Sequence, residues 1–421
     1  MVGLGGSFEK IVTSPGAAWT RLSLRKNRFY YLQASCKVDA QPFVRVWKAN
    51  PASHPLFIPA VSETEYLVKA SDRDIDLYVL EQEIDVKSFR MARPKDFLKA
   101  LRLFRFHRFN RYKDDRLTIL PLLHGCGIRG LETSRAMRTL AEWGVGVSSP
   151  ALQRTMGYEP AERSVSPERP QSGSGLSTGI VVHLHYCDVW PDFEVRLRNL
   201  TSPFRLIVTL TEPNPALAAR IAGQFRDAKV LVYSNRGRDV GPFIQLLRDG
   251  HLDDFELICK LHGKKTMSLG PRVIFGEVWR RLLLNDLVGS DELVRGIVQR
   301  FVSQPRLGLV GSSHFRGSYP GTWPKNASLT LDVAKRLGCP EGQFKPDFFA
   351  GTMFWIRREL LDLLKPLNLS QDDFPVEAGQ TDGTLQHALE RIFGALPGLA
   401  RPPMAIEEIE WRPAEPLSGA H

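Results

Sequence analysis

The sequence predicts an α/β fold for residues 179–400, with a mostly parallel sheet covered by helices on both faces. Three observations support this prediction. Five short apolar runs typical of buried strands occur here, segments with helical patterning separate them, and polar motifs follow directly after several runs. Strands that alternate with helices form parallel sheets, and such sheets bind ligands at the carboxyl ends of their strands.

The predicted strands cover residues 180–185, 204–210, 229–234, 255–261 and 306–311. The predicted helices between them cover residues 190–201, 214–227, 240–250 and 290–304. Pro213 and Asp239 are suitable residues for the start of two of these helices.

Composition divides the chain. Residues 160–178 are rich in Pro, Ser, Gly and charge, which is typical of a linker. The linker separates a region of unknown function, residues 1–159, from the α/β domain, and residues 401–421 form a C-terminal tail. The first region has a mixed pattern, with strand-like stretches at residues 29–32 and 43–47.

The first region also contains a basic segment. Residues 87–116 contain eleven Lys and Arg against three Asp, and Phe97, Leu101, Phe104 and Phe109 recur near helical spacing. The pattern predicts a basic amphipathic helix over residues 97–112. Such a helix packs on its own domain with a solvated basic face, lies on an anionic membrane surface, or binds nucleic acid. No recognisable nucleic-acid-binding module accompanies it, so we expect no nucleic acid as a partner.

Overall composition adds broad limits. The net charge of +10 favours an anionic partner, and five scattered cysteines without a CxxC pair indicate neither a zinc site nor a disulfide framework. No apolar run approaches the length of a membrane span, and the first residues lack the apolar core of a secretory signal. We therefore expect a cytoplasmic protein.

The first candidate binding motif follows the first predicted strand. His183 lies in that strand, and His185, Tyr186 and Asp188 come after it. These side chains could hold a nucleobase and a ribose. The alternative is an ordinary helix start capped by Asp188.

The second motif follows the third strand and contains Asn235, Arg236, Gly237, Arg238 and Asp239. Glycine permits a close backbone approach, and two arginines can clamp a diphosphate. Asp239 could cap the next helix or accept a hydrogen bond from a ribose or sugar hydroxyl.

The third motif follows the fourth strand, where Lys260, His262, Lys264 and Lys265 surround one glycine. Clustered cations repel each other unless an anion neutralises them, and a pyrophosphate is the simplest candidate. The alternative is a solvated loop.

The fourth motif is an aromatic run interrupted by small residues, with Phe349, Gly351, Thr352, Phe354 and Trp355. It could shape a pocket for a sugar or an acceptor. The alternative is a strand of the core.

The fifth motif begins at Asp382 and continues into a predicted helix that carries His387. A carboxylate at a helix start can act as general base for a sugar hydroxyl, and it can equally be only a helix cap.

In this order, the motifs HLHYCDVW, NRGRDVGPF, CKLHGKK, GTMFWIR and DGTLQHALER resemble those of the rhamnan synthesis protein F family, over about residues 179–396. The family is implicated in building rhamnose-containing cell-surface polysaccharides. The resemblance implies a GT-A-like glycosyltransferase that uses a nucleotide-sugar donor such as dTDP-rhamnose. It also implies a polyprenyl-linked or polysaccharide acceptor at the inner face of the membrane, transfer with inversion, and Asp382 as the base.

One departure concerns metal. GT-A enzymes commonly carry an Asp-x-Asp metal site after the fourth strand, where this chain has Lys260, His262, Lys264 and Lys265. These cations would repel a divalent ion, so we expect no metal site and no cofactor besides the donor. Together with Arg236 and Arg238 they would neutralise the leaving diphosphate. The alternative function is a non-catalytic protein that binds carbohydrate or lipid diphosphate in an assembly complex.

Overall fold

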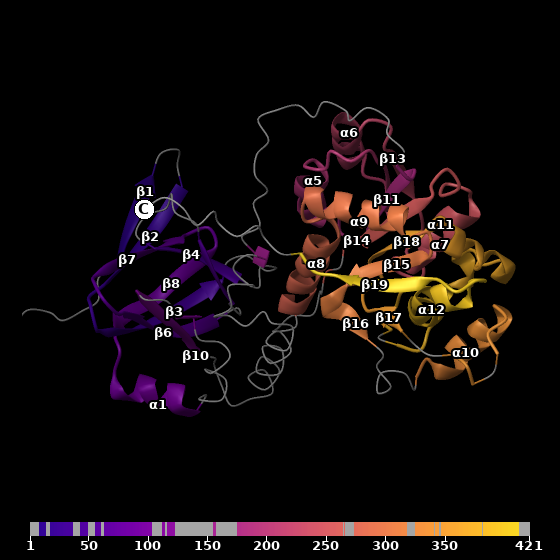
Figure 1. Cartoon of the computed structure of the whole chain (residues 1–421). Helices are drawn as coiled ribbons and strands as arrows, with labels where there is room; N and C mark the ends of the chain where they lie inside the picture. The colour runs from indigo at the N-terminus through magenta and orange to yellow at the C-terminus, as the bar shows by residue number, and fades with distance from the viewer. Residues whose placement is uncertain are drawn as a thin grey trace, which may run out of the picture. The chain divides into compact units, whose positions relative to one another are not determined.

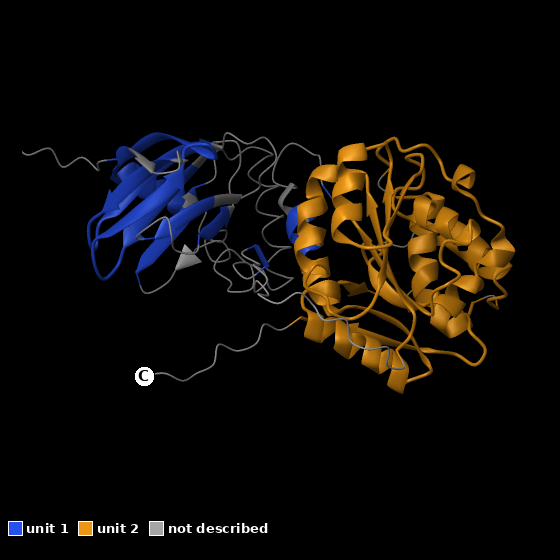
Figure 2. Cartoon of the chain, turned by 90° about the horizontal axis from the view of Figure 1, so that it is seen from above, with its two compact units in different colours: residues 1–159, 264–281 blue, residues 160–263, 282–421 orange. Residues whose placement is uncertain are grey.

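A computed structural model divides the chain into two compact units (Figures 1 and 2). The N-terminal unit comprises residues 1–159 and 264–281, and the C-terminal unit comprises residues 160–263 and 282–421. The structure describes residues 8–13, 17–36, 43–48, 55–59, 63–102, 112–113, 116–122, 155–156, 175–263, 265, 273–317, 325–340, 342–344, 347–380 and 382–411.

The N-terminal unit contains two antiparallel sheets. One has the order β1-β2-β7-β4-β5, and the other has the order β8-β3-β6-β10-β9. The strands are β1 (Phe8–Thr13), β2 (Ala17–Leu24), β3 (Phe29–Cys36), β4 (Phe43–Lys48), β5 (Leu56–Pro59), β6 (Glu63–Ala70), β7 (Ile75–Leu80), β8 (Ile84–Met91), β9 (Tyr112–Lys113) and β10 (Leu117–Leu122). Apolar residues of both sheets, such as Leu22 and Val68, line one internal cavity, so the sheets pack face to face.

Helix α1 (Pro94–Arg102) corrects the predicted amphipathic helix. The helix starts before residue 97, and Tyr112 belongs to strand β9 rather than to a helix. Residues 103–111 lie outside the described residues. Phe97 packs on Phe29, with ring centroids 5.1 Å apart, while Leu98 and Leu101 are exposed. The helix therefore packs on its own unit and still presents apolar side chains to solvent.

The C-terminal unit is built on a seven-stranded sheet with the order β13-β12-β11-β14-β18-β15-β19. Its strands are β11 (Thr178–Leu184), β12 (Arg205–Leu210), β13 (Lys229–Val232), β14 (Leu257–His262), β15 (Leu307–Ser312), β18 (Phe354–Arg357) and β19 (Ala405–Ile409). Strands β16 (Arg316–Gly317) and β17 (Phe348–Phe349) form a separate pair.

The predicted α/β class is confirmed, with a mixed sheet. Strands β13, β12, β11 and β14 are parallel, whereas β18 runs antiparallel to both β14 and β15. The chain inserts β18 between two strands that precede it in sequence, an arrangement that local patterning does not reveal. A second correction concerns the predicted tail, because its residues 405–409 form β19, which pairs with β15 at the edge of the sheet.

Helices cover both faces of this sheet (Figure 2). Helices α7, α10, α11 and α12 contribute to one apolar core with Val181, Ile258 and Phe354 of the sheet. The helices of the unit are α5 (Trp190–Leu197), α6 (Pro215–Gln224), α7 (Val240–Arg248), α8 (Val273–Val288, which spans the boundary of the two units), α9 (Asp291–Ser303), α10 (Ala327–Arg336), α11 (Arg358–Asp362) and α12 (Leu385–Leu399). Short 3-10 turns are η1 (Cys187–Val189), η2 (Ser313–Phe315), η3 (Lys365–Leu367) and η4 (Gln371–Asp373).

None of the helices that the structure describes is long and apolar enough to cross a membrane.

Candidate functional site

Four of the five motifs meet at one edge of the C-terminal sheet, where the parallel strands end. Strands β11, β13 and β14 deliver the first three motifs by their carboxyl ends. Because β18 runs antiparallel, its beginning lies at the same edge, and Gly351 and Thr352 come directly before it. The edge of the sheet at which parallel α/β folds bind ligands is therefore also the edge that carries the motifs.

Asp239 and Lys260 form a buried ion pair at the centre of this edge. The Lys260 side chain is only 2% exposed, and its Nζ donates to Asp239 Oδ2 and to the Thr352 carbonyl oxygen at 2.9 Å. The Thr352 hydroxyl donates to the same carboxylate oxygen. The ammonium also lies 5.4 Å from the centre of the Phe243 ring. Lys260 is thus fixed inside the protein and neutralised by Asp239.

His262 joins this network from the end of β14. Its Nε2 lies 2.7 Å from the Gly351 carbonyl oxygen and 4.0 Å from Asp239 Oδ1. Burial alone raises the pKa of the Asp239 carboxyl. The charges of His262 and Lys260 and the hydrogen bonds outweigh burial and hold that pKa well below its usual range. Asp239 is consequently a permanent anion that locks three segments together.

The two arginines of the second motif hold a distant loop. Arg236 Nη1 donates to the Phe374 carbonyl oxygen at 3.2 Å. Arg238, whose φ of 55° is left-handed, donates from Nε to Glu377 at 2.8 Å and from Nη2 to the Gln380 carbonyl oxygen. The hydrogen bond to Glu377 raises the pKa of Arg238 further. Residues 372–380 are therefore tied to the turn after β13.

Asp382 lies beyond this loop, just before α12. Its Oδ1 is buried and has no hydrogen-bond partner in the part of the chain that the structure describes, and Arg391 Nη2 lies 3.9 Å away. Arg391 is itself bonded to Glu390 and to the His387 carbonyl oxygen. Burial, and after it the charge of Arg238, lowers the pKa of His387. The carboxylate of Asp382 thus lies near a cation that makes its hydrogen bonds to other groups.

The first motif has one buried residue in strand β11 and several more accessible residues after the end of that strand. His183 is fully buried, with Nδ1 2.9 Å from the Thr209 hydroxyl, and burial lowers its pKa to about 3. His185 is exposed and contacts Thr211 in the same way at 2.9 Å. Tyr186 stacks edge-on against His185, and Asp188 is exposed in η1. Only the residues after the strand can reach a ligand.

The predicted sugar pocket needs correction. Phe349, Phe354 and Trp355 are at most 2% exposed, and the Trp355 indole donates to the Leu287 carbonyl oxygen at 3.0 Å. They belong to the core, as the strand interpretation of this motif has it: Phe354 and Trp355 lie on the central strand β18, and Phe349 lies on the short strand β17. Of this set, only Gly351 and Thr352 lie at the sheet edge.

The structure describes the remaining residues of the second and third motifs in part. Asn235 is half-buried and Gly237 has a left-handed φ of 70° in the turn that carries the arginines. Lys264 lies outside the described residues. Lys265 falls in the stretch 264–281 that groups with the N-terminal unit. The part of the third motif that the structure places at the site is Lys260 with His262.

Two acidic or amide side chains at the site, Glu377 and Asn326, lie outside the predicted motifs, whereas Glu390 belongs to the fifth motif. Glu377 binds Arg238, and Glu390 accepts a hydrogen bond from the Gly351 N–H at 2.9 Å. Asn326, the N-cap position of α10, accepts one from the Gly383 N–H at 2.8 Å. No local signal marks Glu377 or Asn326, because their partners lie far away in sequence. Among the residues that the structure describes, no three His, Cys, Asp or Glu side chains form a group that could hold a metal ion.

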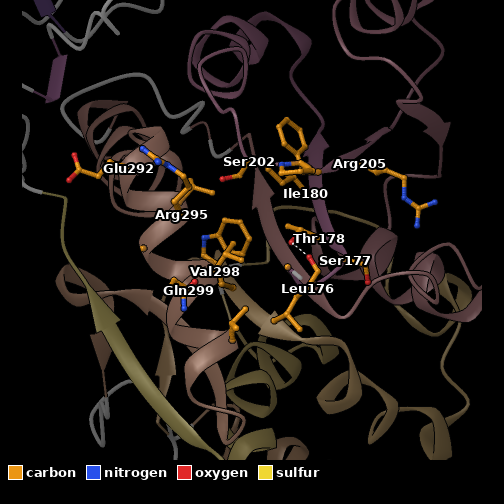
Figure 3. Close-up of a pocket in the computed structure, with 17 residues that line it drawn as sticks. Leu176, Ser177, Thr178, Ile180, Ser202, Arg205, Glu292, Arg295, Val298 and Gln299 are labelled. Atoms are coloured by element: carbon orange, nitrogen blue, oxygen red, sulfur yellow. Dashed lines mark hydrogen bonds between the residues drawn. The ribbon is translucent and has the colours of Figure 1, made fainter. Parts of the chain in front are cut away.

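A hollow of about 1110 Å³ lies at the opposite edge of the sheet (Figure 3). Leu176, Ser177 and Thr178 line it before and at the start of β11, and Glu292 and Arg295 of α9 lie across from them. Apart from the buried Trp355, none of the motif residues lines it. Its size alone does not make it the functional site, because parallel strands present ligands at their other ends.

Comparison with known proteins identifies a family. The model of the family described as rhamnan synthesis protein F matches residues 149–400, more than half of the chain. Two curated relatives, both described as uncharacterized protein WxcX, come from Xanthomonas campestris pv. campestris strains B100 and ATCC 33913. Each is 29% identical over 259 residues, which cover 60% of this chain. The matched part spans only 36% of those relatives' own length.

Similarity to solved structures is weak. Glucosyl-3-phosphoglycerate synthase from Mycobacterium tuberculosis, solved with Mn²⁺, UDP and glucosyl-3-phosphoglycerate, is 12% identical with a TM-score of 0.27 over 59% of this chain and 79% of that chain. A siderophore-interacting protein from Acinetobacter baumannii is 8% identical with a TM-score of 0.17 over 71% of this chain and 84% of that one. TM-scores this low do not establish a shared fold.

Proposed function

The chain belongs to the rhamnan synthesis protein F family, and from that premise we propose that its C-terminal unit is a glycosyltransferase of GT-A-like type. It transfers a sugar, rhamnose from dTDP-rhamnose, to a polyprenyl-linked saccharide or a growing polysaccharide. The single observation that carries the proposal is that the buried Oδ1 of Asp382, just before α12, has no hydrogen-bond partner among the described residues.

Asp382 acts as the general base. As the oxygen of an acceptor hydroxyl attacks the anomeric carbon, its proton passes to the Asp382 carboxylate. The bond from the anomeric carbon to the phosphate oxygen breaks, and the nucleoside diphosphate leaves with the electron pair. Attack from the face opposite the leaving group inverts the anomeric centre. Arg391, 3.9 Å away, stabilises the ionised carboxylate before the proton arrives.

The arginines of the turn after β13 take part in binding the diphosphate. A guanidinium group has five N–H donors. Arg238 uses Nε and Nη2 for the loop and Arg236 uses Nη1. Within the described residues, Arg238 Nη1 and Arg236 Nε and Nη2 make no hydrogen bond, which leaves them available to phosphate oxygens. Lys264 and Lys265 complete the neutralisation in this proposal, without a divalent metal.

His185, Tyr186 and Asp188 are proposed to hold the nucleoside. They are exposed or half-buried after β11, the strand next to the β12–β13 pair that supports the arginine turn. An imidazole and a phenol ring offer a stacking surface for a base, and a carboxylate accepts hydrogen bonds from ribose hydroxyls.

An Asp382→Asn variant tests the reaction. We expect it to bind dTDP-rhamnose as the wild type does and to lose about 10²–10⁴-fold in transfer, because positioned bases contribute rate enhancements of that order. The measurement is dTDP release and label transfer from dTDP-rhamnose to a total membrane fraction. Asp372→Asn, an exposed carboxylate in η4, is the matched control and should keep full activity.

A wild-type protein that binds the donor but releases no dTDP would instead be a non-catalytic component of an assembly complex. Equal activity of the wild type and Asp382→Asn would remove Asp382 from the mechanism while leaving a transferase in place.

We also propose that α1 holds the protein at the inner face of the cytoplasmic membrane. Leu98 and Leu101 are 58% and 65% exposed beside the exposed Arg93 and Lys95. Apolar side chains flanked by cations suit an anionic lipid surface. Sedimentation with vesicles of phosphatidylglycerol should fall sharply in a Leu98→Asp, Leu101→Asp variant, whereas Leu331→Asp, on the exposed side of α10, should not change it.

A further inference from the structure

We propose that Asn326, Asp382 and Gln386 form a subsite that binds two neighbouring hydroxyl groups of a sugar ring, between the beginnings of α10 and α12. The inference rests on the proposed function and deepens it by assigning residues to sugar recognition. The two helices pack against each other, and the hydrogen bond from the Gly383 N–H to Asn326 Oδ1 joins their first residues at 2.8 Å.

Four side-chain atoms on residues at or next to the beginnings of these two helices are buried and have no hydrogen-bond partner among the described residues. They are Asn326 Nδ2, Asp382 Oδ1 and both polar atoms of Gln386, Nε2 and Oε1. Asn326 is fully buried and Gln386 is 3% exposed. A buried polar group without a protein partner costs free energy unless a bound molecule supplies the hydrogen bond. Several such groups at two helix starts that a hydrogen bond joins point to a ligand.

The chemistry of the four atoms is defined. Because the Gly383 N–H donates to Asn326 Oδ1, the amide of Asn326 has a fixed orientation and its Nδ2 is the unused donor. The Gln386 amide supplies one more donor and one acceptor, and the ionised Asp382 supplies a second acceptor. The region therefore offers two donors and two acceptors.

A pair of vicinal hydroxyl groups complements this set, since each hydroxyl donates one hydrogen bond and accepts others. A phosphate does not, because it only accepts and would face the Asp382 carboxylate. The nearby cation also favours a neutral ligand: Arg391 is already bonded to Glu390 at 2.8 Å and to the His387 carbonyl oxygen at 2.7 Å.

Asp382 connects the subsite with the proposed chemistry. If its Oδ1 receives the proton of the attacking hydroxyl, the neighbouring hydroxyl of the same ring meets Gln386 and Asn326. These two amides would then choose which hydroxyl is presented to the base. The subsite would require an acceptor sugar with an unsubstituted vicinal diol.

Gln386→Leu tests this assignment, because leucine removes both orphaned atoms with little change in size. The protein is titrated with methyl α-rhamnoside, alone and with dTDP, and binding is followed by ligand-observed NMR. The 2,3-di-O-methyl derivative reports on the diol, and methyl glycosides of glucose, galactose, mannose and N-acetylglucosamine extend the panel. Gln299→Leu is the control, an exposed helical glutamine that lines the hollow at the opposite edge.

We expect the wild type and Gln299→Leu to bind a free glycoside and to reject its methylated derivative. Gln386→Leu should weaken binding about tenfold, the effect of losing one to two neutral hydrogen bonds. Its unliganded form should melt at the same temperature as the wild type or higher, because a buried unsatisfied amide has been replaced by an apolar group.

A comparison of dTDP-rhamnose with dTDP distinguishes a subsite for the donor sugar from a subsite for the acceptor sugar. If Gln386→Leu instead loses the difference in affinity between dTDP-rhamnose and dTDP, the subsite holds the donor sugar and the inference stands. A Gln386→Leu variant that binds all sugars like the wild type and melts lower would show that the orphaned atoms hold water, which overturns it.

A wild type that binds none of the glycosides and no nucleotide sugar better than its free nucleotide overturns the inference as well. The proposed function is judged separately, by dTDP release from dTDP-rhamnose. Release with unchanged kinetics in Gln386→Leu would therefore leave the transferase and refute the subsite.

Discussion

Replacing Asp239 by asparagine tests the role that the structure gives to the buried ion pair. The substitution keeps the size of the side chain and removes its negative charge. Lys260 Nζ, on a side chain that is 2% exposed, is then left with the Thr352 carbonyl oxygen at 2.9 Å and no opposing charge. We expect Asp239→Asn to be one of the most destabilising single changes at the sheet edge.

The magnitude follows from the burial of the pair. Removing one partner of a buried ion pair costs roughly 3–5 kcal/mol, because the remaining charge is uncompensated. For a unit of this size, about 1 kcal/mol corresponds to about 2–4 °C in melting temperature. The transition of the C-terminal unit should therefore fall by about 6–20 °C.

Calorimetry on the full chain measures this shift. The control is Asp254→Asn, which breaks the pair with Arg205; both side chains of that pair are largely exposed, at 70% and 46%. Exposed pairs contribute about 0–1 kcal/mol, so the control should shift the transition by no more than about 4 °C.

The double variant Asp239→Asn, Lys260→Met removes both charges. It should be more stable than the sum of the single changes predicts, by about 0.5–3 kcal/mol, because neither charge is left alone. An Asp239→Asn variant that melts within about 2 °C of the wild type would show that the ion pair contributes little to stability, and so would single changes whose effects simply add.

Two further predictions concern groups buried in the same unit. Burial lowers the pKa of His183 from 6.5 to about 3, so between these values the unfolded chain takes up a proton that the folded chain does not. This histidine should therefore lower the free energy of unfolding as the pH drops from about 6.5 towards 3, by at most about 1.4 kcal/mol per pH unit. In denaturant titrations at several pH values, the free energy of unfolding of His183→Gln should change less with pH than that of the wild type; an equal change would contradict this. Gly394 and Gly398 both lie in α12, but a Cβ on Gly394 would lie 1.9 Å from the Asp347 carbonyl oxygen, whereas a Cβ on Gly398 meets nothing within 4 Å. Chemical denaturation should show Gly394→Ala destabilised by about 1–3 kcal/mol through overpacking and Gly398→Ala neutral or stabilised by up to about 1 kcal/mol; equal effects would contradict the packing.

The sequence predicts five of the seven strands of the C-terminal sheet, because each of these five is a short apolar run. The run at residues 306–311, for example, corresponds to β15, Leu307–Ser312. Strand β19, with the sequence AIEEI, escapes prediction because an edge strand keeps exposed polar residues. Strand β18 is recognisable as a possible core strand, but its antiparallel insertion depends on long-range pairing.

The sequence predicts where the candidate site lies in the sheet better than it predicts the partners of the charged side chains there. The motifs do gather at the carboxyl ends of the strands, since that follows from the topology. The cationic cluster, however, needs no external anion at Lys260, because the protein supplies Asp239 from 21 residues earlier. Arg238 likewise finds Glu377, 139 residues away. Local sequence shows that charges are close along the chain, and it does not show which partner each one meets in the fold.

We expect the C-terminal unit to bind a nucleotide sugar at the motif-bearing edge. Thermal denaturation with a panel of nucleotide sugars, each with and without Mg²⁺ and Mn²⁺, measures this binding. A ligand present at about one hundred times its Kd stabilises the folded state by about 2.7 kcal/mol. We predict that dTDP-rhamnose raises the melting temperature by several degrees without added metal. If no nucleotide sugar raises it, with or without metal, the C-terminal unit does not bind this class of ligand.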